Sequence, residues 1–128
     1  MSALRNKFIE NSKADQAFCE RFAKQKNGLD YIPWARMWST AMGRYDRVIV
    51  GDTVRRDAEG VSVEVSVILG LGDENSENVY TILAVTDGRN KPIVEPTSAD
   101  VQNTRQRALA KALSMATGIG LSLWFGAL

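Results

Sequence analysis

The strongest constraint on the fold is the alternation of side chains in residues 61–71. The sequence Val-Ser-Val-Glu-Val-Ser-Val-Ile-Leu-Gly-Leu puts a valine or leucine at every odd position, with mostly polar or small residues between them. A period of two belongs to a β-strand, because successive side chains of a strand point to opposite faces of its sheet. The segment is therefore predicted to be a strand with one buried and one partly wet face, as in an antiparallel sheet.

Two further strands are predicted at residues 47–56 and 79–86, which are rich in valine, isoleucine and threonine. Residues 57–60 form a tight turn before the central strand, and the polar, acidic residues 72–78 form a loop after it. Such short connections join antiparallel neighbours. We therefore predict a three-stranded antiparallel β-meander.

A long helix is predicted to begin at Thr97 or Ser98, with Asp100 in the first turn, where a carboxylate suits the positive end of the helix dipole. At about 100° per residue, six apolar side chains fall on one face: Val101, Ala108, Leu109, Ala112, Leu113 and Ala116. Gly118 and Gly120 end the helix, and residues 121–125 are expected to form a short strand or an apolar tail.

The N-terminal part is expected to be helical. After a short lead-in at residues 4–9, Ser12 and Asp15 fit a capping box, and the helix that they begin is predicted to run to about Lys26. Another helix has Pro33 as its first residue and ends at Gly43. Its apolar stripe has helical spacing: Trp34, Met37, Trp38 and Ala41.

These elements predict an α+β fold: a three-stranded antiparallel β-meander packed on a long C-terminal helix, which is a β-β-β-α core, with N-terminal helices before it. The length of 128 residues suits a single domain over residues 1–128. A sheet of this kind has open edges, and open edges favour pairing with a second subunit.

Several classes of enzyme are excluded by residues that the chain lacks. It has no histidine, which rules out Ser-His and Cys-His nucleophile pairs and Cys/His zinc sites. It contains no Walker-type phosphate loop, and no Asp or Glu has a lysine two residues later, as many metal-dependent nucleases do. We therefore expect a protein that is not an enzyme and that uses no cofactor or metal. A nuclease built on Asp52, Glu64 and Asp87 remains an alternative.

The chain shows no signal for a membrane or for secretion. It has no apolar run of about 18 residues, and its first residues lack a secretory signal. The single cysteine, Cys19, excludes an intrachain disulfide and shares an apolar stripe with two phenylalanines, so it is interpreted as a core thiol. A cytoplasmic location without a membrane partner is expected.

The basic side chains are the candidates for binding a polyanion. Residues 61–90 carry one basic and five acidic side chains, which mask a basic excess elsewhere in a chain of net charge +1. Arg107 and Lys111 lie one helical turn apart and can reach phosphates of one strand, although the spacing alone favours a solvated helix face. Lys91, in the loop before this helix, could extend the same surface. The residue types of this loop are, however, those that form turns, so turn formation accounts for them without a binding role.

Three further arginines are weaker candidates. Arg55 and Arg56 end a strand, so one points to each face of the sheet and at most one joins a given groove. Arg105 lies within the apolar sector of the long helix and must extend to water or find a partner.

Aromatic side chains could stack on unpaired bases. For Trp34 and Trp38, the position on an apolar helical stripe favours core packing instead. Tyr31 lies outside the helix in a predicted loop and is the better candidate for stacking.

Three segments carry a resemblance to a known family. They are residues 28–35 (Gly-Leu-Asp-Tyr-Ile-Pro-Trp-Ala), residues 84–91 (Ala-Val-Thr-Asp-Gly-Arg-Asn-Lys), and residues 106–121, which begin Gln-Arg-Ala-Leu-Ala-Lys-Ala-Leu and end Gly-Ile-Gly-Leu. Together they resemble the Sak-type phage single-strand annealing proteins, which are grouped with the eukaryotic Rad-type strand annealers. The resemblance extends from about Leu29 to Phe125. A serine usually stands in the family's aromatic motif at the position of Pro33.

The resemblance implies a β-β-β-α core, assembly into rings or helical filaments, and binding of single-stranded DNA in a basic groove that crosses subunits. It also implies annealing of complementary strands without ATP, in phage homologous recombination inside a bacterial host cell. Arg107 and Lys111 would line the groove with Lys91 as a companion, and Tyr31 and Trp34 match the family's aromatic pair.

The resemblance also bears on partners and leaves alternatives open. A host or phage single-strand-binding protein and an exonuclease are candidate partners, but the chain ends at Leu128 without an acidic tail, so a recruiting tail is expected to be absent or supplied elsewhere. The alternatives are a single-strand-binding module of OB type, which is a five-stranded barrel, the nuclease named above, and an assembly protein that never binds DNA.

Overall fold

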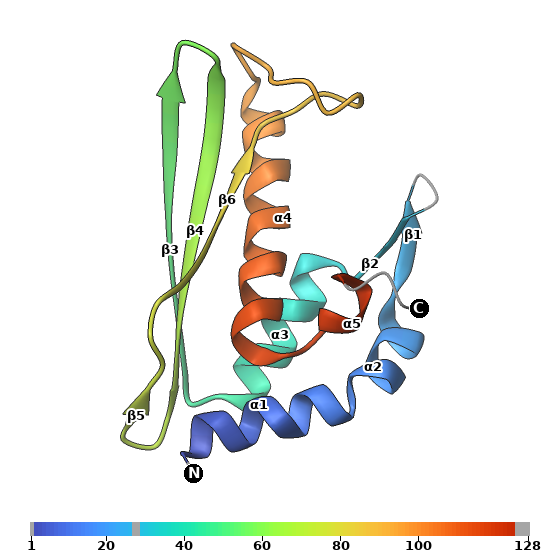
Figure 1. Cartoon of the computed structure of the whole chain (residues 1–128), viewed down its shortest axis with the longest axis vertical. Helices are drawn as coiled ribbons and strands as arrows, with labels where there is room; N and C mark the ends of the chain where they lie inside the picture. The colour runs from blue at the N-terminus through green and yellow to red at the C-terminus, as the bar shows by residue number, and fades with distance from the viewer. Residues whose placement is uncertain (1, 27–28, 125–128) are drawn as a thin grey trace.

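The computed structural model describes residues 2–26 and 29–124 and has an α+β fold (Figure 1). Its sheet contains two long strands, β3 (Arg47–Asp57) and β4 (Gly60–Leu71), joined by a tight turn. Strand β6 (Val79–Ala84) pairs with β4 on the other side, and the two-residue β5 (Glu74–Asn75) pairs with the end of β4. All of these pairings are antiparallel, so the predicted meander is confirmed, with β5 as an addition.

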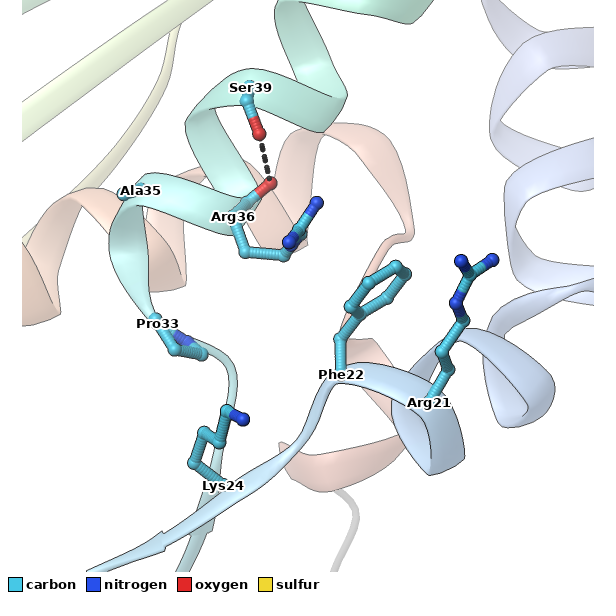
Figure 2. A pocket seen from close by; sticks show the side chains of 7 residues that line it. All are labelled: Arg21, Phe22, Lys24, Pro33, Ala35, Arg36 and Ser39. Atoms are coloured by element: carbon cyan, nitrogen blue, oxygen red, sulfur yellow. Dashed lines mark hydrogen bonds between the residues drawn. The ribbon is translucent and has the colours of Figure 1, made fainter.

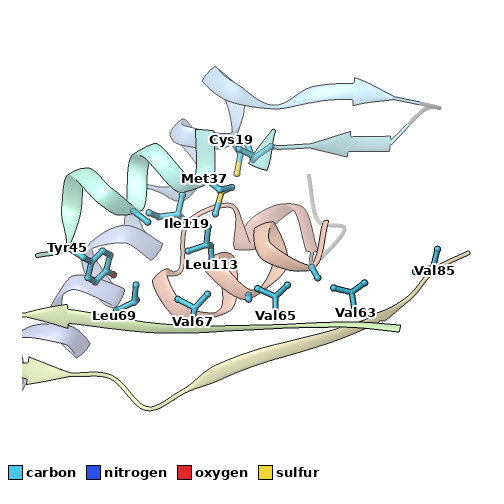
Figure 3. Packing of buried hydrophobic residues seen from close by; sticks show 14 of the residues in the cluster. Cys19, Met37, Tyr45, Val63, Val65, Val67, Leu69, Val85, Leu113 and Ile119 are labelled. Carbon is cyan, nitrogen blue, oxygen red and sulfur yellow. The ribbon is translucent and has the colours of Figure 1, made fainter. Parts of the chain in front are cut away.

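The buried face of β4 is the one that the alternation predicts. Five of its side chains are at most 4% exposed: Val61, Val63, Val65, Val67 and Leu69. Helix α4 (Ser98–Thr117) lies along this face and packs against β4 and β6, with Ala108, Ala112 and Leu113 fully buried (Figure 3). Thr81 Oγ1 in β6 donates a hydrogen bond of 2.8 Å to the carbonyl oxygen of Ala108, which fixes the helix against the sheet.

Helix α4 begins and ends where the sequence predicts. The Thr97 hydroxyl accepts a hydrogen bond from Asp100 N, and the Asp100 carboxylate accepts one from Thr97 N, which completes a capping box. Gly118 follows the helix in the left-handed region, at φ 80°. A Cβ at this position would lie 2.7 Å from Ser12 Oγ and 3.2 Å from Phe8 O, so the glycine also allows a close approach to the first helix.

The N-terminal elements precede the sheet in the chain, and the first and third of their helices pack against α4. These elements are α1 (Ala3–Lys13), α2 (Asp15–Phe22), a hairpin of β1 (Lys24–Lys26) and β2 (Leu29–Tyr31), and α3 (Trp34–Arg44). The buried Asn11 ties three helices together: its Nδ2 donates to Thr117 O at 2.8 Å and to the Tyr45 hydroxyl, and its Oδ1 accepts from Arg44 at 2.7 Å.

The prediction of one helix from a Ser12 capping box to about Lys26 is wrong. The chain breaks at Ala14, which precedes α2 without a side-chain cap, and α2 ends at Phe22 because the next residues form the β1–β2 hairpin. Asp15 does not complete a local box, since its carboxylate accepts from the backbone N–H groups of Gly120 and Ser122 at 2.6 and 2.9 Å. The Asp15 carboxylate therefore binds distant amides instead of completing the predicted capping box with Ser12.

The prediction of a strand or apolar tail at residues 121–125 is also wrong for the residues that the structure describes. Leu121–Trp124 form a short helix, α5, and Phe125 lies outside the described residues. The Asp15 carboxylate holds the first amides of this turn, which satisfies the donors that a helix start exposes. Pro33, predicted as the first residue of its helix, lies one position before α3.

Candidate functional site

Arg107 and Lys111 lie on α4 with the spacing that the sequence predicts. Arg107 is exposed and Lys111 is half-buried. Arg105 precedes Arg107 by two residues and therefore points about 200° away around the helix. The structure thus separates Arg105 from the Arg107/Lys111 pair.

Arg105 finds its partner on the sheet. Its Nε lies 2.7 Å from Asp52 Oδ2 in β3, and its Nη1 donates to Gln102 Oε1 at 3.1 Å. The contact with Asp52 is an ion pair without an aligned hydrogen bond from Nε, and both side chains are 41% exposed. The position of Arg105 in the apolar sector of α4 is explained by this contact.

Arg55 and Arg56 point to opposite faces of the sheet, as predicted. Arg55 lies on the face away from α4, with its Nη2 3.5 Å from Glu64 Oε2. Arg56 points to the α4 side, where it lines a shallow groove with Val54, Val101 and Arg105. Arg56 therefore shares this groove with Arg105, another candidate arginine.

Lys91 lies in a loop held by turn chemistry. Asp87 Oδ1 accepts hydrogen bonds from the backbone N–H groups of Arg89 and Lys91, at 2.8 and 3.1 Å, and Asp87 N donates to Lys91 O at 2.9 Å. The Lys91 side chain is exposed. The loop lies at the end of the sheet where α4 begins (Figure 1), whereas Arg107 lies about 13 Å farther along the helix axis.

The two candidate aromatic residues are both exposed. Tyr31 ends β2, rather than lying in a loop, and is 41% exposed. Trp34 begins α3 and is 39% exposed, so the prediction that it packs in the core is wrong. Met37, which is 1% exposed, takes the core position on this helix, and Trp38 is half-buried against the core.

Sequence reasoning missed a basic pocket where α2, β1 and α3 meet (Figure 2). Its lining includes Arg21, Lys24 and Arg36. The guanidinium carbons of Arg21 and Arg36 lie 4.9 and 4.3 Å from the centre of the Phe22 ring. The sequence places Arg21 and Lys24 on one long helix, and only the turn into the hairpin brings them to α3. Their nearness in sequence to Tyr31, the predicted stacking residue, was an available signal.

The comparison with known families decides the identity. A sequence model of the family described as Sak Single Strand Annealing Protein matches residues 8–127. The chain belongs to this Sak single-strand annealing family. No curated protein and no solved structure was found to match it. The family match covers the three predicted resemblance segments, all the predicted site residues and the basic pocket.

The carboxylates of the nuclease alternative do not converge in this Sak-family protein. Asp52 lies on the α4 side of the sheet, Glu64 on the opposite side, and Asp87 is engaged in its loop turn. Within residues 2–26 and 29–124, no group of three or more His, Cys, Asp or Glu side chains could hold a metal ion. Among the helices described, none is long and apolar enough to cross a membrane.

Cys19 is a core thiol, as the sequence predicts. It is 2% exposed, and its Sγ lies 3.6 Å from Asp15 Oδ2. Burial, and then the neighbouring Asp15 charge, raise the pKa of this thiol from 9.0 to about 12. The thiol therefore stays protonated near neutral pH and is a poor nucleophile.

Proposed function

We propose that this Sak-family protein binds single-stranded DNA and anneals complementary strands without ATP, in phage homologous recombination within the bacterial cytoplasm. Membership of a single-strand annealing family over residues 8–127 carries this proposal. A single-strand-binding protein and an exonuclease are the protein partners that we propose for it.

Arg107 and Lys111 are proposed to contact successive phosphates of one strand. They lie one turn apart on α4, and Arg107 is exposed. Phosphate contacts of this kind are sequence-tolerant, which annealing requires, because the base edges must stay open to a second strand. Exposed Tyr31 and Trp34 can add stacking, at about 1–3 kcal/mol per base.

ATP independence is supported by the chemistry of the reaction. Duplex formation from complementary strands lowers the free energy, so a protein that reduces the repulsion between two phosphate backbones needs no energy source. The chain contains no Walker-type phosphate loop for a nucleotide.

Assembly into a ring or filament is supported by strand β3. It is an edge strand of the sheet, and each of its residues from Ile49 to Asp57 is exposed. Val50 and Val54, on the α4 side, are 37% and 39% exposed, and Ile49, on the other face, is 55% exposed. Long exposed edge strands with apolar side chains are prone to pair with another chain, and a head-to-tail contact generates rings or filaments.

The OB alternative finds no support in the described residues. The sheet order is β3-β4-β6, with α4 across one face, rather than a closed five-stranded barrel.

An annealing assay tests the proposal. Two complementary oligonucleotides, one carrying a fluorophore and the other a quencher, are mixed with the protein in buffer containing EDTA and no nucleotide. We expect duplex formation to be faster than in the protein-free control. A rate equal to that control would contradict annealing, and cleavage of either strand on adding Mg²⁺ would favour the nuclease alternative.

A further inference from the structure

The pocket between α2, β1 and α3 gathers three cations from three different elements. Arg21 lies in the last turn of α2, Lys24 begins β1 and Arg36 lies in the first turn of α3. Figure 2 shows the two arginines on either side of the Phe22 ring, with Lys24 extending from β1 toward Pro33. None of the three forms a salt bridge within the described part of the chain.

The pocket carries a net positive charge, because its lining includes these three cations and no carboxylate. The ring contacts orient two of the guanidinium groups without neutralising them. The pocket is therefore charged and partly preorganised for an anionic ligand.

The chemistry of the lining favours phosphate. A guanidinium is planar, and when its face lies on an aromatic ring its N–H edge remains available for a bidentate contact with phosphate oxygens. The lysine adds a mobile point charge. Pro33 and Ala35, which also line the pocket, flank exposed Trp34 in the chain, and exposed Tyr31 lies two residues before Pro33. Cations beside exposed aromatic residues are typical of single-strand binding surfaces.

We propose that Arg21, Lys24 and Arg36 bind a backbone phosphodiester of single-stranded DNA, with Tyr31 and Trp34 available to stack on the adjoining bases. This inference rests on the proposed function and adds a phosphate contact among the N-terminal elements, distinct from the Arg107/Lys111 pair on α4.

Salt-dependent binding of a fluorescent dT oligonucleotide tests the pocket. Arg21→Gln, Arg36→Gln and their combination are compared with Arg5→Gln, which removes the same charge from exposed Arg5 of α1, outside the pocket. We expect roughly ten-fold weaker binding for each pocket arginine removed. The slope of log K against log salt should fall by about 0.7 for each phosphate that is no longer neutralised, and the control should match the wild type.

Folding is checked separately, because Arg21 and Arg36 both contact Phe22. Thermal unfolding is measured for each variant, and Lys24→Gln, whose side chain makes no ring contact, removes a pocket charge without disturbing that packing. Folded pocket variants that bind as tightly and with the same salt slope as Arg5→Gln would overturn the proposal. A wild-type protein that does not bind the oligonucleotide would instead contradict the proposed function itself.

The source of the phosphate is tested with two further probes. Oligonucleotides with a 5′-hydroxyl or a 5′-phosphate should bind equally well if the pocket takes the backbone, and millimolar inorganic phosphate should compete no better than chloride at equal ionic strength. A 5′-phosphate preference or specific competition by inorganic phosphate, abolished in the pocket variants, would overturn the backbone assignment in favour of a terminal or free phosphate.

Discussion

Asp15 and Gly120 lie 105 positions apart in the chain and are joined by a hydrogen bond of 2.6 Å from the Gly120 N–H to the Asp15 carboxylate. The other carboxylate oxygen accepts from the backbone and hydroxyl of Ser122. Asp15 is 3% exposed, so its charge is stabilised by these donors rather than by water. The contact attaches α5 to the start of α2.

Asp15→Asn should therefore destabilise the protein by about 2 kcal/mol, because a neutral amide has one acceptor oxygen where the carboxylate has two. The free energy of unfolding in urea measures the effect. Asp100→Asn, which weakens an exposed capping box, should cost about half as much. Equal unfolding midpoints for wild type and Asp15→Asn would contradict this account.

Cys19 should make the stability fall at high pH. Below about pH 9 the thiol is protonated in both states, but above it the unfolded thiol ionises while burial keeps the folded pKa near 12. Ionisation then favours the unfolded chain, so stability is lost as pH rises from 9 toward 12. Urea unfolding at pH 8, 9 and 10 should show a steeper fall for wild type than for Cys19→Ala.

The Cys19→Ala variant is needed as a reference because burial also raises the pKa of the Tyr45 hydroxyl, which acts in the same direction. Parallel pH profiles for the two proteins would show that the thiol has no part in the effect.

Lys111→Ala should weaken binding to single-stranded DNA of every sequence alike and lower the salt slope by about 0.7, the value for one single-strand phosphate contact. The reason is that a phosphate contact releases counterions but reads no bases. Fluorescence anisotropy at several salt concentrations measures both quantities, with Arg5→Gln as the charge-matched control. An unchanged slope would show that Lys111 does not contact phosphate.

If the protein forms the proposed ring or filament through β3, Val50→Lys should reduce the size of that assembly without unfolding the subunit. Val50 is 37% exposed on edge strand β3, so a charge there is tolerated in the monomer but opposes burial against another copy. Sedimentation velocity measures the size, and Asn6→Lys places the same charge on exposed α1 as a control. If both variants keep the wild-type size, β3 is not the contact between subunits.

Much of the fold could be predicted because its signals are local. The alternation around Val63 and Val65 dictates which face of β4 is buried, since strand side chains alternate whatever the partner is. Thr97 and Asp100 satisfy each other's amides within one turn. The spacing of the candidate pair Arg107 and Lys111 follows from helix geometry alone.

Tertiary structure decided what depends on distant partners. Asp15 binds the amides of Gly120 and Ser122, which favours a helix rather than a strand at Leu121–Trp124. The pocket of Arg21, Lys24 and Arg36 exists only because the hairpin folds α2 back toward α3. Side-chain periodicity and helix capping depend only on residues close together in one segment, so the sequence by itself determines them. The burial of Asp15 and the gathering of the three pocket cations depend on which segments pack together. Only the tertiary structure determines that packing.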